Sequence, residues 1–226
     1  RMLARGNTRL RALFEALSTT GFFSIAGSTI VNRVLSFMSG ILVVRLLSKT
    51  DYGVYSYTYN ILNIALLFNG IGVASAFIQL CCEPGGNQKE ADLERWGFKC
   101  GGLFDVVLSV ILFFWATFTP ESMPGTRPLL QICALYPIPQ FIFDMQTAAL
   151  RAQLRNNDYA TANVINISCV VAGTVVGAFL FGAIGLLIGR VVGIVISTVL
   201  VYNRFKVPLL FSLVRTRKDT DSICLQ

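Results

Sequence analysis

Arginines inside apolar stretches are the residues of this sequence best suited to bind a ligand. Arg33 lies near the middle of the first long apolar run, with Asn32 beside it, Arg45 lies toward the end of that run, and Arg190 lies within the last run. A charged side chain at the bilayer centre costs about 2.5–3.5 kcal/mol on insertion scales, so it normally faces a partner or a water-filled cavity. Because the planar guanidinium binds phosphate oxygens in pairs, we expect these residues to hold an anionic, phosphate-bearing ligand.

The same arginines also fit a purely structural interpretation. Arg33 could pair with Asp144 or Asp105 and so hold helices together, and Arg190 could do the same. Arg45 could extend to the outer headgroups. Asp144 is therefore a candidate either for an ion pair or for the coupling site of a proton or cation in a secondary transporter.

Amide and aromatic side chains gather in the second apolar run. Asn60 and Asn63 are three residues apart and share one face of a helix. Tyrosines crowd the start of this run at Tyr52, Tyr55, Tyr57 and Tyr59. Contact with a sugar is one interpretation and makes Asn63 a candidate binding residue, whereas an interfacial aromatic belt explains the tyrosines without a ligand.

Several kinds of chemistry have no residues to support them. The chain contains no histidine, no C-x-x-C pair and no GxxxxGK[ST] loop. We therefore expect no metal site, no cofactor, no nucleotide hydrolysis and no enzymatic activity. A membrane glycosyltransferase or polymerase is a weaker alternative, because the loop Glu83–Gly97 and the tail are too small for an active site.

The elements that position these residues follow from hydropathy. Of the 226 residues, 54% are hydrophobic and 14% charged, against roughly 25% charged in soluble domains. Since a helix of roughly 20 residues crosses the hydrocarbon layer, we predict an all-α integral membrane protein with about six transmembrane helices. The predicted crossings are Phe22–Leu47, Tyr55–Cys82, Phe98–Thr119, Leu129–Leu150, Ala160–Phe181 and Ile184–Tyr202.

Proline and glycine predict the breaks and contacts of these helices. Pro137 and Pro139 remove backbone donors inside the fourth crossing and predict a kink. Glycines recur at intervals of four, at Gly173, Gly177, Gly185, Gly189 and Gly193, and predict close helix packing. The link Gly182–Ala183 between the last two crossings must be a tight hairpin.

The distribution of basic residues predicts orientation. Most Lys and Arg residues fall at one set of helix ends: Arg1, Arg5, Arg9, Arg11, Lys89, Arg95, Lys99, Arg151, Arg155, Arg204, Lys206, Arg215, Arg217 and Lys218. By the positive-inside rule this side is cytoplasmic, so both termini lie in the cytoplasm and the protein lies in the cytoplasmic (inner) membrane. Because the net charge of +7 sits between apolar runs, it does not indicate a nucleic-acid partner.

Three regions are expected along the chain. They are a basic amphipathic N-terminus at 1–21, a six-helix membrane lobe at 22–203 and a basic tail or linker at 204–226. An even number of crossings allows such a lobe to be duplicated in tandem with its orientation kept. The start at Arg1 instead of methionine predicts that the sequence is part of a longer protein.

One turn carries a family resemblance. Arg45-Leu-Leu-Ser-Lys-Thr-Asp-Tyr-Gly-Val-Tyr-Ser56 resembles the first periplasmic turn of polysaccharide and O-antigen flippases (Wzx-like) of the multidrug/oligosaccharidyl-lipid/polysaccharide (MOP) exporter superfamily. The family pattern has Arg-Leu-Leu, a Gly-Pro pair and Asp-Tyr-Gly, and Ser48-Lys49 replaces Gly-Pro here. Gly70–Gln79 and Arg151–Tyr159 are also similar to family segments.

The resemblance implies a function. Such proteins export undecaprenyl-diphosphate-linked oligosaccharides, including lipopolysaccharide precursors, by alternating access between two lobes, and this chain would be the first lobe. Its implied partners are the lipid-linked oligosaccharide, membrane lipids, and a C-terminal lobe or a second copy. The alternative is a MATE-type multidrug or cation antiporter lobe, for which acidic sites such as Asp144 suit better than Arg33.

Overall fold

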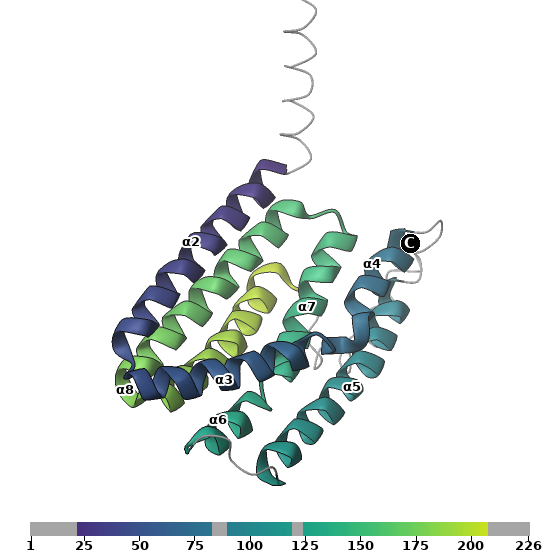
Figure 1. Cartoon of the computed structure of the whole chain (residues 1–226). Coiled ribbons are helices and arrows are strands. Elements are labelled where there is room, and N and C mark those ends of the chain that lie inside the picture. The colour runs from purple at the N-terminus through teal and green to yellow at the C-terminus, as the bar shows by residue number, and fades with distance from the viewer. Residues whose placement is uncertain (1–21, 83–89, 119–123, 208–226) are drawn as a thin grey trace, which may run out of the picture.

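A computed structural model describes residues 22–82, 90–118 and 124–207, and all regular structure in these ranges is helical (Figure 1). The elements are α2 (Phe22–Leu46), α3 (Lys49–Leu66), the 3-10 turn η1 (Asn69–Gly72), α4 (Val73–Cys82), α5 (Glu90–Phe118), α6 (Thr126–Cys133), α7 (Pro137–Ala152) and α8 (Asn156–Phe205). The predicted N-terminal region at 1–21 and the tail beyond residue 207 lie outside the described residues.

The second predicted crossing is longer than expected and is broken in the middle. It begins at Lys49, where the Ser48 hydroxyl accepts the backbone N–H of Asp51 at 3.1 Å and caps α3. The hydropathy pattern predicts only the apolar part of this helix, from Tyr55 onward. The helix breaks between α3 and α4, where Gly70 and Ile71 take left-handed φ angles of 57° and 46°.

The third and fourth crossings also depart from their predicted limits. Residues 90–97, predicted as part of a polar loop, form the first turns of α5, because Glu90-Ala-Asp-Leu-Glu-Arg is rich in good helix formers. The fourth crossing is divided into α6 and α7. Pro137 stands in the first turn of α7, where its missing N–H needs no helical partner, which confirms the predicted disruption.

The last two predicted crossings form the two arms of α8, which folds back on itself. The reversal occurs at Phe181 and Gly182, and Gly182 has φ 59° and ψ −138°, a combination that favours glycine. This confirms the predicted hairpin. The arms pack so closely that a Cβ atom on Gly189 would overlap the carbonyl oxygen of Gly173, and one on Gly185 would overlap that of Gly177.

Two apolar clusters hold the helices together. One joins α2, α3, α6 and α8 around Leu62, Leu186 and Ile194, and the other joins α4, α5, α7 and α8 around Phe141 and Leu150. α2 packs along α8 at one side, while α4 and α5 lie at the opposite side (Figure 1).

The outside of the lobe suits lipid. Large apolar side chains such as Phe37, Phe118 and Phe179 are 69–77% exposed, as expected where hydrocarbon is the solvent. In the described ranges, four segments are long and apolar enough to cross a membrane: Ser24–Leu46, Lys49–Cys82, Asp92–Phe118 and Asn156–Phe205. The last one supplies both α8 arms, and the shorter α6 and α7 occupy the place of the fourth predicted crossing, so the count of six is approximate.

The hairpin contact predicts the effect of a single methyl group. Gly189→Ala should lower the free energy of unfolding by about 1–3 kcal/mol, because the added Cβ forces the two backbones apart. Denaturation of the purified protein in detergent measures this change. Gly27→Ala is the matched control, since a Cβ at Gly27 on α2 meets nothing within 4 Å; equal losses in both variants would contradict the packing argument.

Candidate functional site

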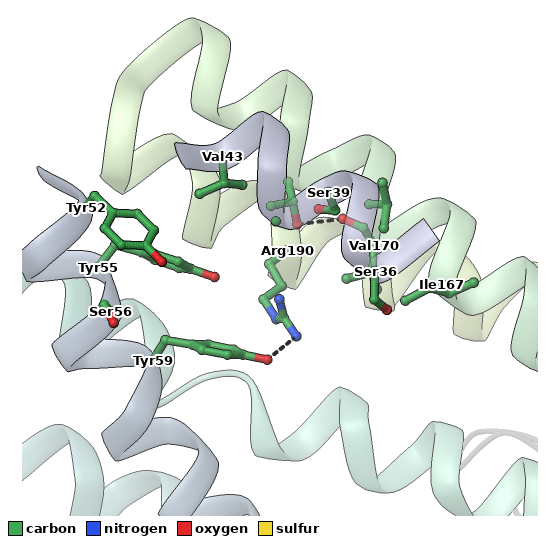
Figure 2. A pocket seen from close by; sticks show the side chains of 13 residues that line it. Ser36, Ser39, Val43, Tyr52, Tyr55, Ser56, Tyr59, Ile167, Val170 and Arg190 are labelled. Atoms are coloured by element: carbon green, nitrogen blue, oxygen red, sulfur yellow. Dashed lines mark hydrogen bonds between the residues drawn. The ribbon is translucent and has the colours of Figure 1, made fainter. Parts of the chain in front are cut away.

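A cavity of about 280 Å³ lies between α2, α3 and the two arms of α8 (Figure 2). Hydroxyl groups and aromatic rings make up much of its wall, and Arg190 supplies a cationic group. The lining residues are Ser36, Ser39, Gly40 and Val43 from α2, Tyr52, Tyr55, Ser56 and Tyr59 from α3, and Ile167, Val170, Val171, Thr174 and Arg190 from α8.

The guanidinium of Arg190 is held by aromatic side chains. Its Nη2 donates a hydrogen bond to the Tyr59 hydroxyl at 2.9 Å, and its Cζ lies 4.6 Å from the centre of the same ring. The ring of Tyr136, from the junction of α6 and α7, lies 5.6 Å away. These cation–π contacts stabilise a charge that has left water.

Arg190 keeps unused binding capacity. Among the described residues no carboxylate forms an ion pair with its guanidinium. Its Nε is buried and has no hydrogen-bond partner there. A buried donor without a partner costs about 1–3 kcal/mol or more for a charged group, so this N–H is well placed to bind an anionic oxygen.

Helical spacing builds the walls of the cavity. On α3, Tyr52, Tyr55 and Tyr59 recur at three- and four-residue steps and therefore share one face. The rings of Tyr55 and Tyr59 stack at 5.6 Å with an angle of 17° between planes. On α2, Ser36 and Gly40 are four residues apart, and Gly40 leaves space because it has no side chain.

The arrangement suits an anion attached to a polar, hydroxylated group. A guanidinium in a low-dielectric site attracts an oxyanion far more strongly than it does in water. The serine, threonine and tyrosine hydroxyls can each donate and accept hydrogen bonds, which sugar hydroxyls require. The tyrosine rings offer flat apolar surfaces beside these groups.

Of the five predicted binding residues, Arg190 is the one that lines the cavity. Asn32 and Arg33 precede Ser36 by four and three residues, so they lie about one turn further along the same side of α2. Arg33 is exposed, whereas Asn32 is half-buried and its Oδ1 is buried without a partner. Asn63 is exposed one turn beyond Tyr59 on α3, and Arg45 is exposed near the end of α2.

Asp105, which is buried, and Asp144, which is half-buried, lie elsewhere and accept hydrogen bonds from neutral groups. Asp144 accepts hydrogen bonds from the side-chain amides of Asn69 at 2.9 Å and Gln140 at 2.8 Å. Asp105 accepts the backbone N–H of Gly70. The described residues therefore show no ion pair between Arg190 and an aspartate.

Some site residues escaped the sequence reasoning. Ser36, Ser39 and Thr174 are ordinary polar residues of membrane helices, and nothing in their spacing marks a ligand. Tyr136 reaches Arg190 only because the chain breaks between α6 and α7. The tyrosine series of α3 is visible in the sequence, but its partner on α8, 131 residues from Tyr59, cannot be predicted from spacing.

Comparison with known protein families identifies the family of this chain. The profile of a family described as "Polysaccharide biosynthesis protein" matches residues 41–219. The chain belongs to this family. The match includes the Asp-Tyr-Gly turn, all of α3 to α8 and the lining of the Arg190 cavity except Ser36, Ser39 and Gly40. No protein in the curated collection matches the chain.

A solved transporter shares the fold of this polysaccharide biosynthesis family member. The MATE transporter VcmN of Vibrio cholerae, crystallised in its bent form, superposes with a TM-score of 0.59 at 16% sequence identity. The superposition covers 89% of this chain and 48% of the transporter. The chain thus has the fold of one half of this MATE transporter and spans about half of its length. Its long apolar helices make it a multi-pass membrane protein.

The contact between Arg190 and Tyr59 predicts a measurable loss of stability. Tyr59→Phe keeps the ring but removes the hydroxyl that accepts from Nη2, so the free energy of unfolding should fall by about 1.5–3 kcal/mol. Denaturation of the purified protein in detergent measures this free energy of unfolding. Tyr202→Phe is the control, because no hydrogen bond to the Tyr202 hydroxyl is found among the described residues; a loss as large in this control would contradict the assignment.

Proposed function

We propose that this lobe takes part in exporting lipid-linked oligosaccharide precursors across the cytoplasmic membrane, with Arg190 binding the anionic diphosphate. The family membership and the transporter fold support transport linked to polysaccharide synthesis. The observation that carries the proposal is the half-buried Arg190, whose guanidinium lines the cavity, keeps a buried and unpartnered Nε, and pairs with no carboxylate among the described residues. O-antigen and other lipopolysaccharide precursors are substrates of the required chemistry.

The polar surface around the cavity suggests how a large substrate would pass. Asn32 and Arg33 lie one turn before Ser36 on the side of α2 that lines the cavity. Asn63 lies one turn after Tyr59 on the corresponding side of α3. A diphosphate held at Arg190 would leave its sugars near these residues. Arg33 then serves as a second cation for the anionic group as the substrate moves along α2.

The fold of α8 brings basic residues together, which supports the orientation proposed from the sequence. Because α8 folds back at Gly182, its two ends lie at the same end of the lobe. Arg155, Arg204 and Lys206 are therefore brought to one side, together with Arg151 at the end of α7. We assign this side to the cytoplasm.

A second lobe is part of the proposal. The neighbour is about twice as long as the superposed region, and transport by alternating access requires two bodies that move against each other. A C-terminal lobe or a second copy of this chain would supply the other wall of the substrate path. The MATE-type drug antiporter is the alternative, but Arg190 would repel the cationic compounds that such an antiporter takes.

Replacement of the cavity arginine tests the proposal directly. Arg190→Gln should weaken binding of undecaprenyl diphosphate to the purified protein by about tenfold or more, since charge-assisted hydrogen bonds contribute about 1.5–3 kcal/mol. Native mass spectrometry of protein titrated with the lipid measures this affinity. Arg204→Gln, at the far end of α8, should bind like the wild type.

Two results would count against the Arg190 assignment. One is unchanged binding in Arg190→Gln, and the other is equal weakening in Arg204→Gln, which would indicate attraction by net charge alone. Arg190→Lys separates charge from geometry: because lysine lacks the planar fork, intermediate affinity is expected.

Replacement of Arg33 tests whether the substrate moves along α2. Arg33→Ala should abolish complementation of a flippase-deficient strain while the protein stays inserted and abundant, because the Arg33 side chain is exposed and not part of the core. Growth or surface-polysaccharide staining reports export, and immunoblotting of membranes reports abundance. Full export by Arg33→Ala would remove Arg33 from the proposal.

A further inference from the structure

The charge of Arg190 has to be balanced whether or not a large substrate is bound. Arginine stays protonated in proteins, so loss of a proton cannot remove this charge. Its Nε is buried and has no hydrogen-bond partner among the described residues. No acidic residue is found among the described residues that line the cavity. Because a buried and unpaired ion is costly, the compensating charge has to come from outside this part of the chain.

The groups that contact Arg190 reduce the cost of its charge without cancelling it. The rings of Tyr59 and Tyr136 make cation–π contacts with the guanidinium, and the Tyr59 hydroxyl accepts a hydrogen bond from it. All of these groups are neutral. The carboxylates of Asp105 and Asp144 accept hydrogen bonds at the break between α3 and α4, and in the described ranges neither forms an ion pair with Arg190.

Hydroxyl groups converge on the same cavity. Figure 2 shows the hydroxyls of Tyr55 and Tyr59 pointing from α3 toward Arg190. The Tyr59 oxygen accepts from Nη2 of Arg190, so its own O–H can still donate. Ser36 and Ser39 line the α2 side of the cavity, and their hydroxyls form no hydrogen bond with another described residue. The cavity therefore gathers N–H and O–H donors around one positive charge.

The size of the cavity suits a small ion with its water. The cavity volume is about 280 Å³, against about 30 Å³ for one water molecule in the liquid. A monatomic anion accepts hydrogen bonds from any direction, so it can contact the Nε–H and a hydroxyl at the same time. Water molecules can bridge the remaining distance between the anion and the cavity wall.

We propose that the Arg190 cavity binds a small inorganic anion, chloride, when no diphosphate occupies it. The anion accepts hydrogen bonds from the Nε–H of Arg190 and from the hydroxyls of the cavity wall. Its single negative charge offsets the single positive charge of the guanidinium. The cavity offers one cation and otherwise neutral donors, which matches a monovalent anion better than a multiply charged one.

A consequence for transport rests on the proposed function, whereas chloride binding itself does not. Diphosphate and chloride contact the same Nε–H, so they exclude each other. At a chloride concentration about ten times its own dissociation constant, about one cavity in eleven is free. The apparent dissociation constant for the diphosphate then rises about elevenfold. Binding of the substrate releases a chloride ion, and the lobe exchanges one anion for another.

The test of chloride binding uses the full chain, purified in a non-ionic detergent, with no lipid-linked sugar present. The line width of the chloride NMR signal is measured while sodium chloride is added to a low-salt buffer. A bound chloride ion gives a much broader signal than a free one, so binding produces an excess width that saturates. Detergent without protein supplies the baseline.

Arg190→Gln is the test variant, and Arg204→Gln is the control because it removes an equal charge at the far end of α8. A saturable excess width, lost in Arg190→Gln and kept in Arg204→Gln, supports the proposal. Three results overturn it: no saturable excess width in the wild type, an unchanged width in folded Arg190→Gln, or an equal loss in both variants.

Tyr59→Phe keeps the test decisive should Arg190→Gln fail to fold. This change removes a hydroxyl that we expect the anion to contact and leaves the ring in place. The chloride concentration at half-saturation should rise by about two- to tenfold, the effect of one net hydrogen bond. An unshifted value in folded Tyr59→Phe, with no folded Arg190 variant to show a loss, also overturns the site.

Competition tests the exchange separately. Addition of undecaprenyl diphosphate should remove the excess width of the chloride signal in the wild type. An excess width that the lipid leaves unchanged refutes shared occupancy, although the chloride site stands. Intact chloride binding without lipid binding counts against the proposed function alone, and intact lipid binding without a chloride signal overturns this inference alone.

Discussion

The close backbone contact between the two arms of α8 is the constraint on which the candidate site depends. At Gly173, Gly177, Gly185 and Gly189 the arms approach so closely that a side chain on either would meet backbone of the other. Dispersion contacts and small residues hold membrane helices together, because lipid gives helix association no hydrophobic drive. Gly189 is one of these contact residues, and Arg190 follows it directly in the chain. The contact therefore sets the position of Arg190 opposite the tyrosines of α3.

Within the described residues, the lobe keeps the cationic Arg190 apart from the two aspartates Asp105 and Asp144. Arg190 is held by aromatic rings between α2, α3 and α8, while Asp105 and Asp144 are held by amides at the break between α3 and α4. Both centres contact the same broken crossing, through Tyr59 on one side of the break and Gly70 within it. The broken crossing therefore contacts both the arginine and the two aspartates.

Much of the fold was predictable because local sequence dictates it. The long apolar runs, the prolines at Pro137 and Pro139 and the glycine at Gly182 correctly indicated the crossings, the break before α7 and the hairpin of α8. The errors fell at helix ends and at the break between α3 and α4, which was not predicted. Lys49 and Glu90 start their helices outside the apolar runs, since capping and helix propensity extend a helix into water where hydropathy gives no signal.

The sequence by itself determined that this is an all-α membrane protein with arginines inside its apolar runs, because composition and hydropathy are local properties, and the Asp-Tyr-Gly turn indicated its polysaccharide-related family. Only the tertiary structure decided which arginine meets a cavity. Arg33 and Arg190 are alike in sequence, both being cations in apolar runs, yet one is exposed and the other is enclosed by Tyr59 and Tyr136. The difference depends on how distant helices pack, and packing between helices far apart in the chain leaves no periodic signal in either of them.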